Sequence, residues 1–274
     1  MEMEMEMEVD SSSDGTTLTQ GSDAWHAARR GKVTASNLGT ILGFTERFEK
    51  GRRQIAFDNL RTELGGGISP PFVHNEAMRW GTTHEINGVE AYSAIGAKFN
   101  PDAELYVQPT GLHIHPQHPW LAASPDGLVG TEGAIEVKCP FNPLRTLSEA
   151  PYSWCLYDSY IAQINCVLET LGRDWCDFIR WKQNSVLVVR IKRDPGLFAT
   201  LLPYYESFYA SANVQGASLP PLTDDNHTQI NDALKRHRAT MCSIVAETPH
   251  TGLFTRAKDG PVLFVYNRWS GKMI

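Results

Sequence analysis

The chain lacks any apolar run close to the ~20 residues that a membrane-spanning helix needs, and no signal peptide opens it. None of its five cysteines forms a CxxC pair, and the histidines are not spaced like zinc-finger ligands. We therefore expect no zinc finger, iron–sulfur cluster or disulfide framework. The cysteines favour a reducing, intracellular compartment, cytoplasmic or nuclear, rather than secretion. They are Cys139, Cys155, Cys166, Cys176 and Cys242.

An excess of basic charge is also missing, because the formal net charge is −6. Much of this acidity lies in residues 1–14, which hold six acids and no Lys or Arg. Without that run, 25 acidic residues balance 25 basic ones, so charge neither indicates nor excludes a nucleic-acid groove. We expect residues 1–20, an alternating Met-Glu run followed by small polar residues, to form a disordered acidic tail.

The chain has 274 residues, of which 42% are hydrophobic, and it can therefore bury one large core. We divide it into the tail, a main domain over 21–213 and a C-terminal extension over 214–274 of unknown role. Apolar spacing and capping residues predict helices that begin near Asp23, Thr34 and Asn75, and helices over 158–171, 198–212 and 230–245. Short apolar runs predict strands over 105–107, 112–114, 121–123, 134–137, 175–181, 185–191 and 262–266. This order indicates an α/β fold with a central mixed sheet flanked by helices.

The strongest chemical signal is the segment SPDG at 124–127, followed by a short strand that ends in Glu-Val-Lys. On a strand, Glu136 and Lys138 point to one face, and the Asp-Gly turn brings Asp126 back over that face. Two carboxylates and an ammonium suit a hard cation and a phosphate. Taken separately, a plain hairpin turn and a solvent-facing strand pair explain these residues. Together with the flanking apolar strands, they match the PD-(D/E)xK nuclease signature.

Phosphodiester hydrolysis gives each of these residues a role. Asp126 and Glu136 are the expected Mg²⁺ ligands, and the Val137 carbonyl is a plausible third oxygen. Lys138 is placed to orient the attacking water or to steady the charge on the phosphoryl group.

Two residues outside this hairpin extend the candidate site. Glu85 follows Gly81 by one helical turn, and the missing side chain leaves that face open for a second metal ion. An exposed helical acid is the alternative for Glu85. Gln163 lies at the edge of the apolar stripe of helix 158–171, where its amide needs a partner such as a metal-bound water or Lys138.

The chain resembles the phage lambda exonuclease family of YqaJ-type viral recombinases. The matching segments, in order, are AWHAARRGKVTAS (24–36), RWGTTHE (79–85), ASPDG (123–127), IEVKCPF (135–141) and YIAQIN (160–165). The resemblance implies a restriction-endonuclease-like fold and processive 5′→3′ digestion of one strand of duplex DNA. It also implies that Glu85, Asp126, Glu136, Lys138 and Gln163 are active-site residues.

The same resemblance implies an anion pocket for the 5′-terminal phosphate. The family's arginine and serines match Arg29, Ser36 and Ser124, and the nearest counterpart of a further arginine is Arg145, displaced by about one position. An arginine fork, hydroxyl groups and the start of a helix together suit a phosphate.

The expected cofactor is Mg²⁺, as two ions, with Mn²⁺ as a substitute. The expected partners are double-stranded DNA ends carrying a 5′-phosphate and a single-strand annealing protein, with no membrane. The oligomeric state is open between a monomer and a homo-trimer. Two alternative functions stay open on the same fold: an endonuclease of DNA or RNA, and an inactive module that binds DNA ends.

Several other residue types favour structural roles. We interpret His113, His115 and His118 as polar strand and turn residues that face solvent rather than as a metal cluster. Cys139 is expected to be a small buried side chain. The tryptophans Trp25, Trp80 and Trp154 are expected to lie in the core.

Overall fold

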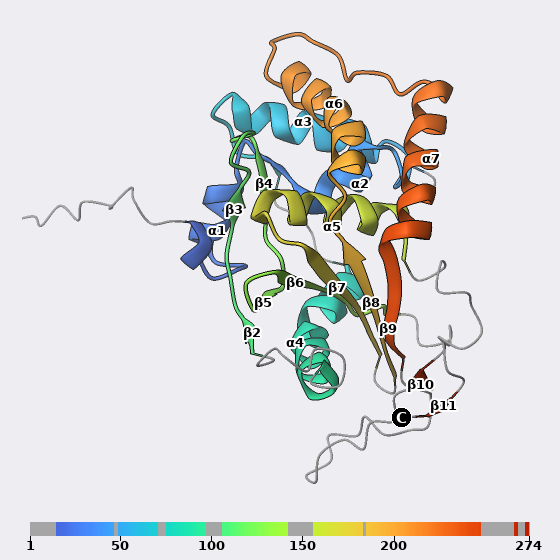
Figure 1. Ribbon diagram of the computed structural model, residues 1–274. Helices are drawn as coiled ribbons and strands as arrows, with labels where there is room; N and C mark the ends of the chain where they lie inside the picture. The colour runs from blue at the N-terminus through green and yellow to red at the C-terminus, as the bar shows by residue number, and fades with distance from the viewer. Residues whose placement is uncertain are drawn as a thin grey trace, which may run out of the picture.

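Six strands lie side by side in a central sheet in the computed structural model (Figure 1). The structure describes residues 15–46, 49–70, 75–96, 106–141, 156–182, 185–247, 266–267 and 272–273. Neighbouring strands are antiparallel except for the parallel pair of β6 and β7. Across the sheet the order is β2 (Val107–Gln108), β5 (Gly127–Val129), β6 (Gly133–Lys138), β7 (Trp175–Lys182), β8 (Ser185–Lys192) and β9 (Cys242–Glu247). The predicted mixed sheet flanked by helices is confirmed.

Helices cover both faces of this sheet (Figure 1). A parallel strand pair needs a crossover connection, and α5 (Asp158–Leu171) lies between β6 and β7 in the chain. Because side chains alternate along a strand, Ile135 and Val137 share an apolar cluster with Tyr92 of α4 (Glu76–Gly96). On the other face, Ala134 belongs to the cluster that contains Ile161 of α5. Strand β6 thus carries the two apolar cores on its opposite faces.

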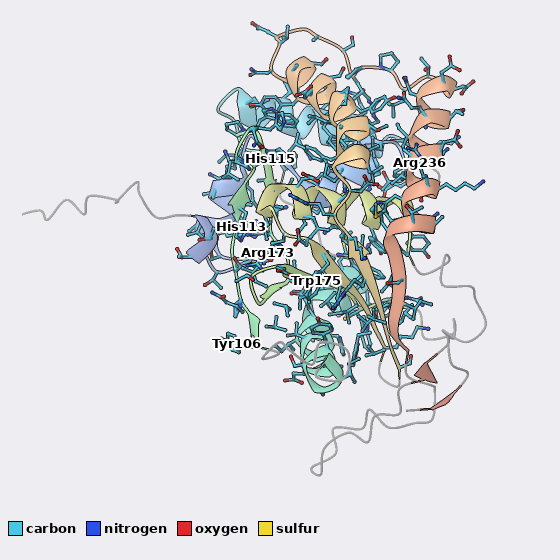
Figure 2. The ribbon with its side chains drawn as sticks, in the orientation of Figure 1. Tyr106, His113, His115, Arg173, Trp175 and Arg236 are labelled. Atoms are coloured by element: carbon cyan, nitrogen blue, oxygen red, sulfur yellow. The ribbon has the colours of Figure 1, made fainter. Side chains whose placement is uncertain are left out.

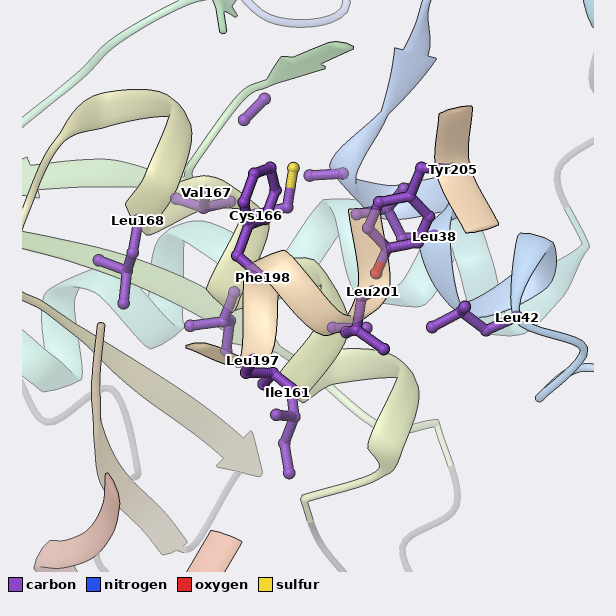
Figure 3. Packing of buried hydrophobic residues seen from close by; sticks show 14 of the residues in the cluster. Leu38, Leu42, Ile161, Cys166, Val167, Leu168, Leu197, Phe198, Leu201 and Tyr205 are labelled. Carbon is purple, nitrogen blue, oxygen red and sulfur yellow. The ribbon is translucent and has the colours of Figure 1, made fainter. Parts of the chain in front are cut away.

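The larger core joins α5 to helices from both ends of the chain. Figure 3 shows Leu38 from α2 (Leu38–Ile41) beside Tyr205 from α6 (Pro195–Ala212), and Leu201 of α6 and Ile161 belong to the same apolar cluster. All four side chains are almost completely buried. Burying a Leu or Ile side chain contributes roughly 1.5–3 kcal/mol, so this contact holds the N-terminal part of the chain on the sheet domain.

A second, three-stranded sheet places the segments that carry the predicted phosphate ligands. Its order is β1 (Val33–Thr34), β4 (Leu121–Ala123) and β3 (His113–Ile114), and β1 runs parallel to β4. The chain leaves β1 toward Ser36 and leaves β4 toward Ser124. Because paired parallel strands end at the same edge, these two serines emerge from neighbouring strand ends.

The other elements are short helices, two longer helices and a small hairpin. They are η1 (Gly15–Thr17), α1 (Asp23–Arg29), η2 (Ala35–Asn37), α3 (Arg52–Leu64), α7 (Asp224–Met241), β10 (Tyr266–Asn267) and β11 (Lys272–Met273). No helix among the described residues is long and apolar enough to span a membrane.

Several predicted elements are confirmed, including helix 158–171 and the hairpin of β7 and β8. Asn75 caps α4 as expected, because its side-chain oxygen accepts a hydrogen bond from the Met78 N–H at 2.9 Å. The first helix begins as predicted, but its cap is Ser22 rather than Asp23. The strand predicted over 262–266 lies outside the described residues except for its last residue.

Helix α3 is an element that the sequence did not predict. The capping position at its N-terminus is Gly51, in a left-handed conformation with φ of 82°, and Glu46 Oε1 accepts a hydrogen bond from the Arg53 N–H at 2.6 Å. Only Arg53, Phe57 and Leu60 of its residues are buried, so its apolar pattern is weak. The helix is held instead by tertiary contacts, because Arg53 donates to the carbonyl oxygens of Ile41 at 2.7 Å and Pro220 at 2.6 Å.

The C-terminal extension contributes to the main fold over residues 224–247. The helix predicted over 230–245 ends at Met241, and β9 then pairs with β8 as the edge strand of the sheet. A fully buried His237 of α7 contacts Asp194 at 3.1 Å. Arg238 forms an ion pair with Asp158 at the start of α5. These contacts hold α7 against α5 and α6.

Residues 15–20 were predicted to belong to the disordered tail, and this prediction is wrong. Gly15–Thr17 form a 3-10 helix that docks on residues 110–112. The N–H of Gly111 donates to the Thr16 carbonyl at 2.7 Å, and that of Leu112 donates to the Gly15 carbonyl at 2.9 Å. The segment is polar in sequence but satisfies its backbone groups through a distant part of the chain.

Candidate active site

The hairpin of β5 and β6 places Asp126 opposite Glu136. Gly127 pairs with Ile135 in this antiparallel hairpin, so Asp126, which precedes Gly127, lies opposite Glu136, which follows Ile135. The Asp126 N–H donates to the Ile135 carbonyl at 3.1 Å, and the Val137 N–H donates to Asp126 Oδ2 at 2.6 Å. These two bonds fix both the backbone and the side chain of Asp126 against β6.

The other end of this hairpin is held by a residue that follows α5. Arg173 donates from Nη1 to the carbonyl oxygens of Gly130 at 2.9 Å and Gly133 at 2.7 Å. Figure 2 shows Arg173 and Trp175 at this end of the sheet. A Cβ on Gly133 would overlap the Trp175 ring, so only glycine allows the ring to cover the turn. The hairpin that carries the acids is therefore fixed at both ends.

Glu136 is the most buried acid of the site, with 2% of its surface exposed. Its Oε1 accepts hydrogen bonds from Lys138 Nζ and from Gln163 Nε2, the latter at 2.6 Å. Gln163 thus contacts a carboxylate, whereas a water or Lys138 was the expected partner. Among the described residues no donor reaches Glu136 Oε2, which is buried. One oxygen of the carboxylate is saturated and the other is left for a further positive partner.

Glu85 reaches the same cluster from α4, on the opposite side of the sheet from Gln163. It is half-buried and interacts electrostatically with Glu136 and Lys138. Gly88, almost one turn further along the helix, allows this approach: a Cβ there would overlap Val137 Cγ1. The predicted open position holds as well, since a Cβ on Gly81 would meet no described atom within 4 Å. We call Glu85, Asp126, Glu136 and Lys138 the acidic cluster.

Replacing Gly88 with alanine is expected to lower activity more than tenfold and to destabilise the fold by about 1–3 kcal/mol, because α4 must move away from β6. Thermal unfolding and the rate of DNA hydrolysis would measure the two effects. Gly81→Ala is the matched control for stability on the same helix, where the new methyl group has room and alanine favours the helix by roughly 1 kcal/mol. Equal melting temperatures for the two variants would contradict the close packing of Gly88 against Val137.

The electrostatics of the cluster favour a bound cation. Burial, Glu136 and Glu85 hold the pKa of Asp126 well above its usual range. Burial and Glu136 likewise raise the pKa of Glu85. Burial opposes the charge on Lys138, but Glu136 and Asp126 outweigh it and raise the pKa of the ammonium. One lysine therefore faces three acids, and a bound cation would relieve the repulsion that raises the pKa values of Asp126 and Glu85.

The donor set fits Mg²⁺. The described residues contain no preformed group of three His, Cys, Asp or Glu side chains that could hold a metal alone. Mg²⁺ does not require one, because it is usually held by one or two carboxylates together with waters and substrate phosphates. Asp126 and Glu136 supply two carboxylates, and the unsatisfied Oε2 is a free ligand atom. The Val137 carbonyl and Glu85 remain predicted ligands.

A second polar group lies around Arg29, at the end of α1. Its Nη2 donates to Thr34 Oγ1 at 3.2 Å and to Ser36 Oγ at 3.4 Å. The guanidinium lies over the Trp25 ring, 4.0 Å from the centroid. The indole N–H of Trp25 donates to Ser124 Oγ at 3.0 Å. We call these five residues the arginine pocket.

Burial in the arginine pocket partly removes the guanidinium of Arg29 from water. It lowers the pKa of Arg29 to about 10, and the carboxylate of Glu63 partly opposes this shift. Arg30, its neighbour in sequence, is exposed, which resolves which of the two arginines faces the pocket. A partly desolvated arginine with hydroxyl groups beside it is a strong site for a phosphate.

The structure places seven of the ten predicted site residues in these two groups, and two more, Val137 and Gln163, form hydrogen bonds to Asp126 and Glu136. The turn from Ser124 to Asp126 belongs to both, since Ser124 contacts Trp25 and Asp126 contacts β6. Arg145 lies outside the described residues. The two predicted pockets are therefore joined by a single turn of three residues.

A comparison with protein families identifies this arrangement. The family model described as YqaJ-like viral recombinase domain matches residues 24–174, more than half of the chain. The chain belongs to the YqaJ-like viral recombinase family. The predicted resemblance is confirmed, and the matched range contains every predicted site residue from Arg29 to Gln163.

The LHK-Exo structures have the same fold as this chain. An alkaline exonuclease, LHK-Exo, from Laribacter hongkongensis is 28% identical, with a TM-score of 0.53 and coverage of 80% of this chain and 98% of that chain. Its complex with dAMP gives the same values. A phage related exonuclease from Haemophilus somnus 129PT is 15% identical, with a TM-score of 0.46 and coverage of 66% and 92%. No curated protein matches the sequence significantly.

Sequence reasoning missed three contacts of the YqaJ-like domain. Tyr160 lies beside the acidic cluster, with its ring centroid 5.5 Å from Lys138 Nζ. Thr34 supplies an additional hydroxyl group to the arginine pocket. Trp25 was expected in the core, but it is half-buried and joins Arg29 to Ser124. The matched segments quoted above contain all three, but spacing alone does not give their partners.

The histidines of the β3 region differ from the expectation in one respect. His115 is 4% exposed and its ring stacks on Phe198 at 5.3 Å, so it does not face solvent. Burial lowers its pKa to about 4, which keeps it neutral. His113 contacts Thr110 Oγ1 at 2.7 Å instead. Figure 2 labels His113 in β3 and His115 just beyond its end. Cys139 is buried as predicted, and Trp154 lies outside the described residues.

Proposed function

We propose that the protein is a DNA exonuclease that requires Mg²⁺ and digests one strand of duplex DNA from its 5′ end to mononucleotides. Membership in the family and the likeness to an alkaline exonuclease support a nuclease acting on DNA. The turn shared by the acidic cluster and the arginine pocket supports digestion from the 5′ end. An end held in the pocket leaves the next phosphodiester near the acids.

The residues of the acidic cluster divide the chemical work. A divalent cation, when bound, activates water and neutralises charge on the phosphoryl oxygens, and Mn²⁺ is expected to replace Mg²⁺. Glu136 would hold this cation through Oε2, because Gln163 and Lys138 already occupy Oε1. Asp126 would bind it through Oδ1, since Oδ2 accepts a hydrogen bond from the Val137 N–H. Glu85, on α4, would bind the second ion that we expect.

Lys138 adds a positive charge that does not depend on the cation. Its ammonium is held by Glu136 and lies over the Tyr160 ring. In that place it orients the attacking water and stabilises the additional charge on the phosphoryl group. Attack breaks the bond between phosphorus and the 3′ oxygen, which releases a mononucleotide and leaves a new 5′-phosphate on the shortened strand. That phosphate is again a ligand for the arginine pocket.

The wild-type protein is expected to digest a 5′-phosphorylated duplex roughly 10- to 100-fold faster than the same duplex with a 5′-hydroxyl, because hydrogen bonds to a charged group contribute about 1.5–3 kcal/mol. End-labelled duplexes and product sizing by electrophoresis would measure both the rate and the direction. EDTA should stop the reaction. Undiminished hydrolysis in EDTA, or cleavage of a closed circular DNA at a similar rate, would contradict the proposal and favour an endonuclease in the second case.

A further inference from the structure

A cavity of about 570 Å³ lies beside the acidic cluster, and the N-terminal segment forms one of its sides. Glu85 and Asp126 line it together with residues 16–20 and residues 108–110. The segment 15–20 precedes residues 24–174, the range that the family model matches. It nevertheless reaches the candidate metal ligands.

Close backbone packing fixes this segment in place. Besides the hydrogen bonds of Thr16 and Gly15 to residues 111 and 112, two glycines allow the chains to approach. A Cβ on Gly111 would overlap the carbonyl oxygens of Gly15 and Leu18, and one on Gly15 would lie 2.8 Å from the Leu112 carbonyl oxygen. Glycine is therefore required on both sides of this contact, at Gly15 and at Gly111.

Gln20 connects the segment to the turn that carries Asp126. Its Nε2 donates to the Pro125 carbonyl at 2.8 Å and to the Thr110 carbonyl at 3.0 Å. Asp126 is already held from β6 on one side. The hydrogen bond to Pro125 holds the peptide group immediately before it from the other side.

We propose that residues 15–20 complete the active site and that Gln20 is a positioning residue for Asp126. The inference rests on the proposed function for its catalytic consequence, but its structural part does not. Two amide hydrogens of one side chain join the acid-bearing turn to the wall of the cavity. Without them the turn keeps its bonds to β6 and loses its second support, so the carboxylate of Asp126 becomes less well placed for the cation.

Gln20→Glu tests this inference most sharply, because the side chain keeps its size while two carboxylate oxygens face two carbonyl oxygens. We expect kcat to fall about tenfold, with KM for DNA changed less than about twofold, since a displaced ligand affects the chemical step more than binding. Hydrogen–deuterium exchange of the metal-free protein should show faster exchange at the amides of Asp126 and Val137. The melting temperature should change by less than about 4 °C.

Two truncations provide the matched comparison. Removal of residues 1–14 should leave exchange at Asp126 and kcat as in the wild type, whereas removal of residues 1–20 should resemble Gln20→Glu. Wild-type exchange and kcat in Gln20→Glu would overturn the inference, and so would a general loss of protection across the sheet. If the wild-type protein hydrolyses no DNA, the proposed function fails, while the exchange comparison still decides the role of Gln20.

Discussion

Replacing Lys138 with alanine is expected to reduce mononucleotide release about 100- to 1000-fold, the loss typical of removing one group that stabilises the transition state. The ammonium is the positive group the described structure places within the acidic cluster, and its removal leaves Glu85, Asp126 and Glu136 to repel one another. Release of label from a 5′-phosphorylated duplex in Mg²⁺ would measure the rate. Binding of the duplex in Ca²⁺ should persist, because the arginine pocket is unchanged.

Lys192→Ala is the matched control for this experiment. Lys192 lies on β8 in the same sheet but is exposed and outside both groups of site residues. Its activity and melting temperature should equal those of the wild type. A Lys138→Ala protein that folds and retains activity within tenfold of the wild type would refute the assignment of the acidic cluster as the catalytic centre.

Replacing Arg29 with glutamine is expected to remove most of the preference for a 5′-phosphate, a loss of roughly 10- to 100-fold on phosphorylated ends. The rate on 5′-hydroxyl ends should change little, because the acidic cluster keeps its geometry. The ratio of the two rates, measured on duplexes of identical sequence, isolates the pocket from the chemistry. Such a result would show that the residues around Arg29 set the 5′→3′ direction of digestion.

Arg30→Gln provides the comparison for Arg29→Gln. It removes the same charge one residue away, but from a side chain that is exposed. We expect the phosphate preference to survive this change. Equal effects of the two substitutions would indicate a general electrostatic attraction to DNA rather than a specific pocket.

The hairpin of the acidic cluster was predictable because its parts are close in sequence. Strand alternation places Glu136 and Lys138 on one face, and the Asp-Gly turn requires Asp126 to return beside them. Glu85 depends on a tertiary contact, the approach of α4 to Val137 at Gly88, which no local pattern shows. Gln163 was placed on the correct face, but its partner Glu136 follows from side-chain conformation rather than from spacing.

The remaining differences have the same origin in long-range contacts. Residues 15–20 have the composition of a disordered tail, and they are ordered by residues 110–112, which lie far along the chain. Helix α3 has glycine at its capping position and is held through Glu46 and Arg53. Trp25 has the side chain of a core residue, yet its N–H bonds Ser124 and its ring supports Arg29. Local secondary-structure propensity does not predict any of these long-range partners.

The turn from Ser124 to Asp126 has a consequence for the size of the products. It fixes the separation between the arginine pocket, proposed to hold the strand end, and the acidic cluster, proposed to hydrolyse it, because Trp25 and β6 hold the turn from either side. If the proposed function holds, a fixed separation would admit one phosphodiester at a time. The length of the released fragment would then be set by three residues of backbone, with no need to recognise bases.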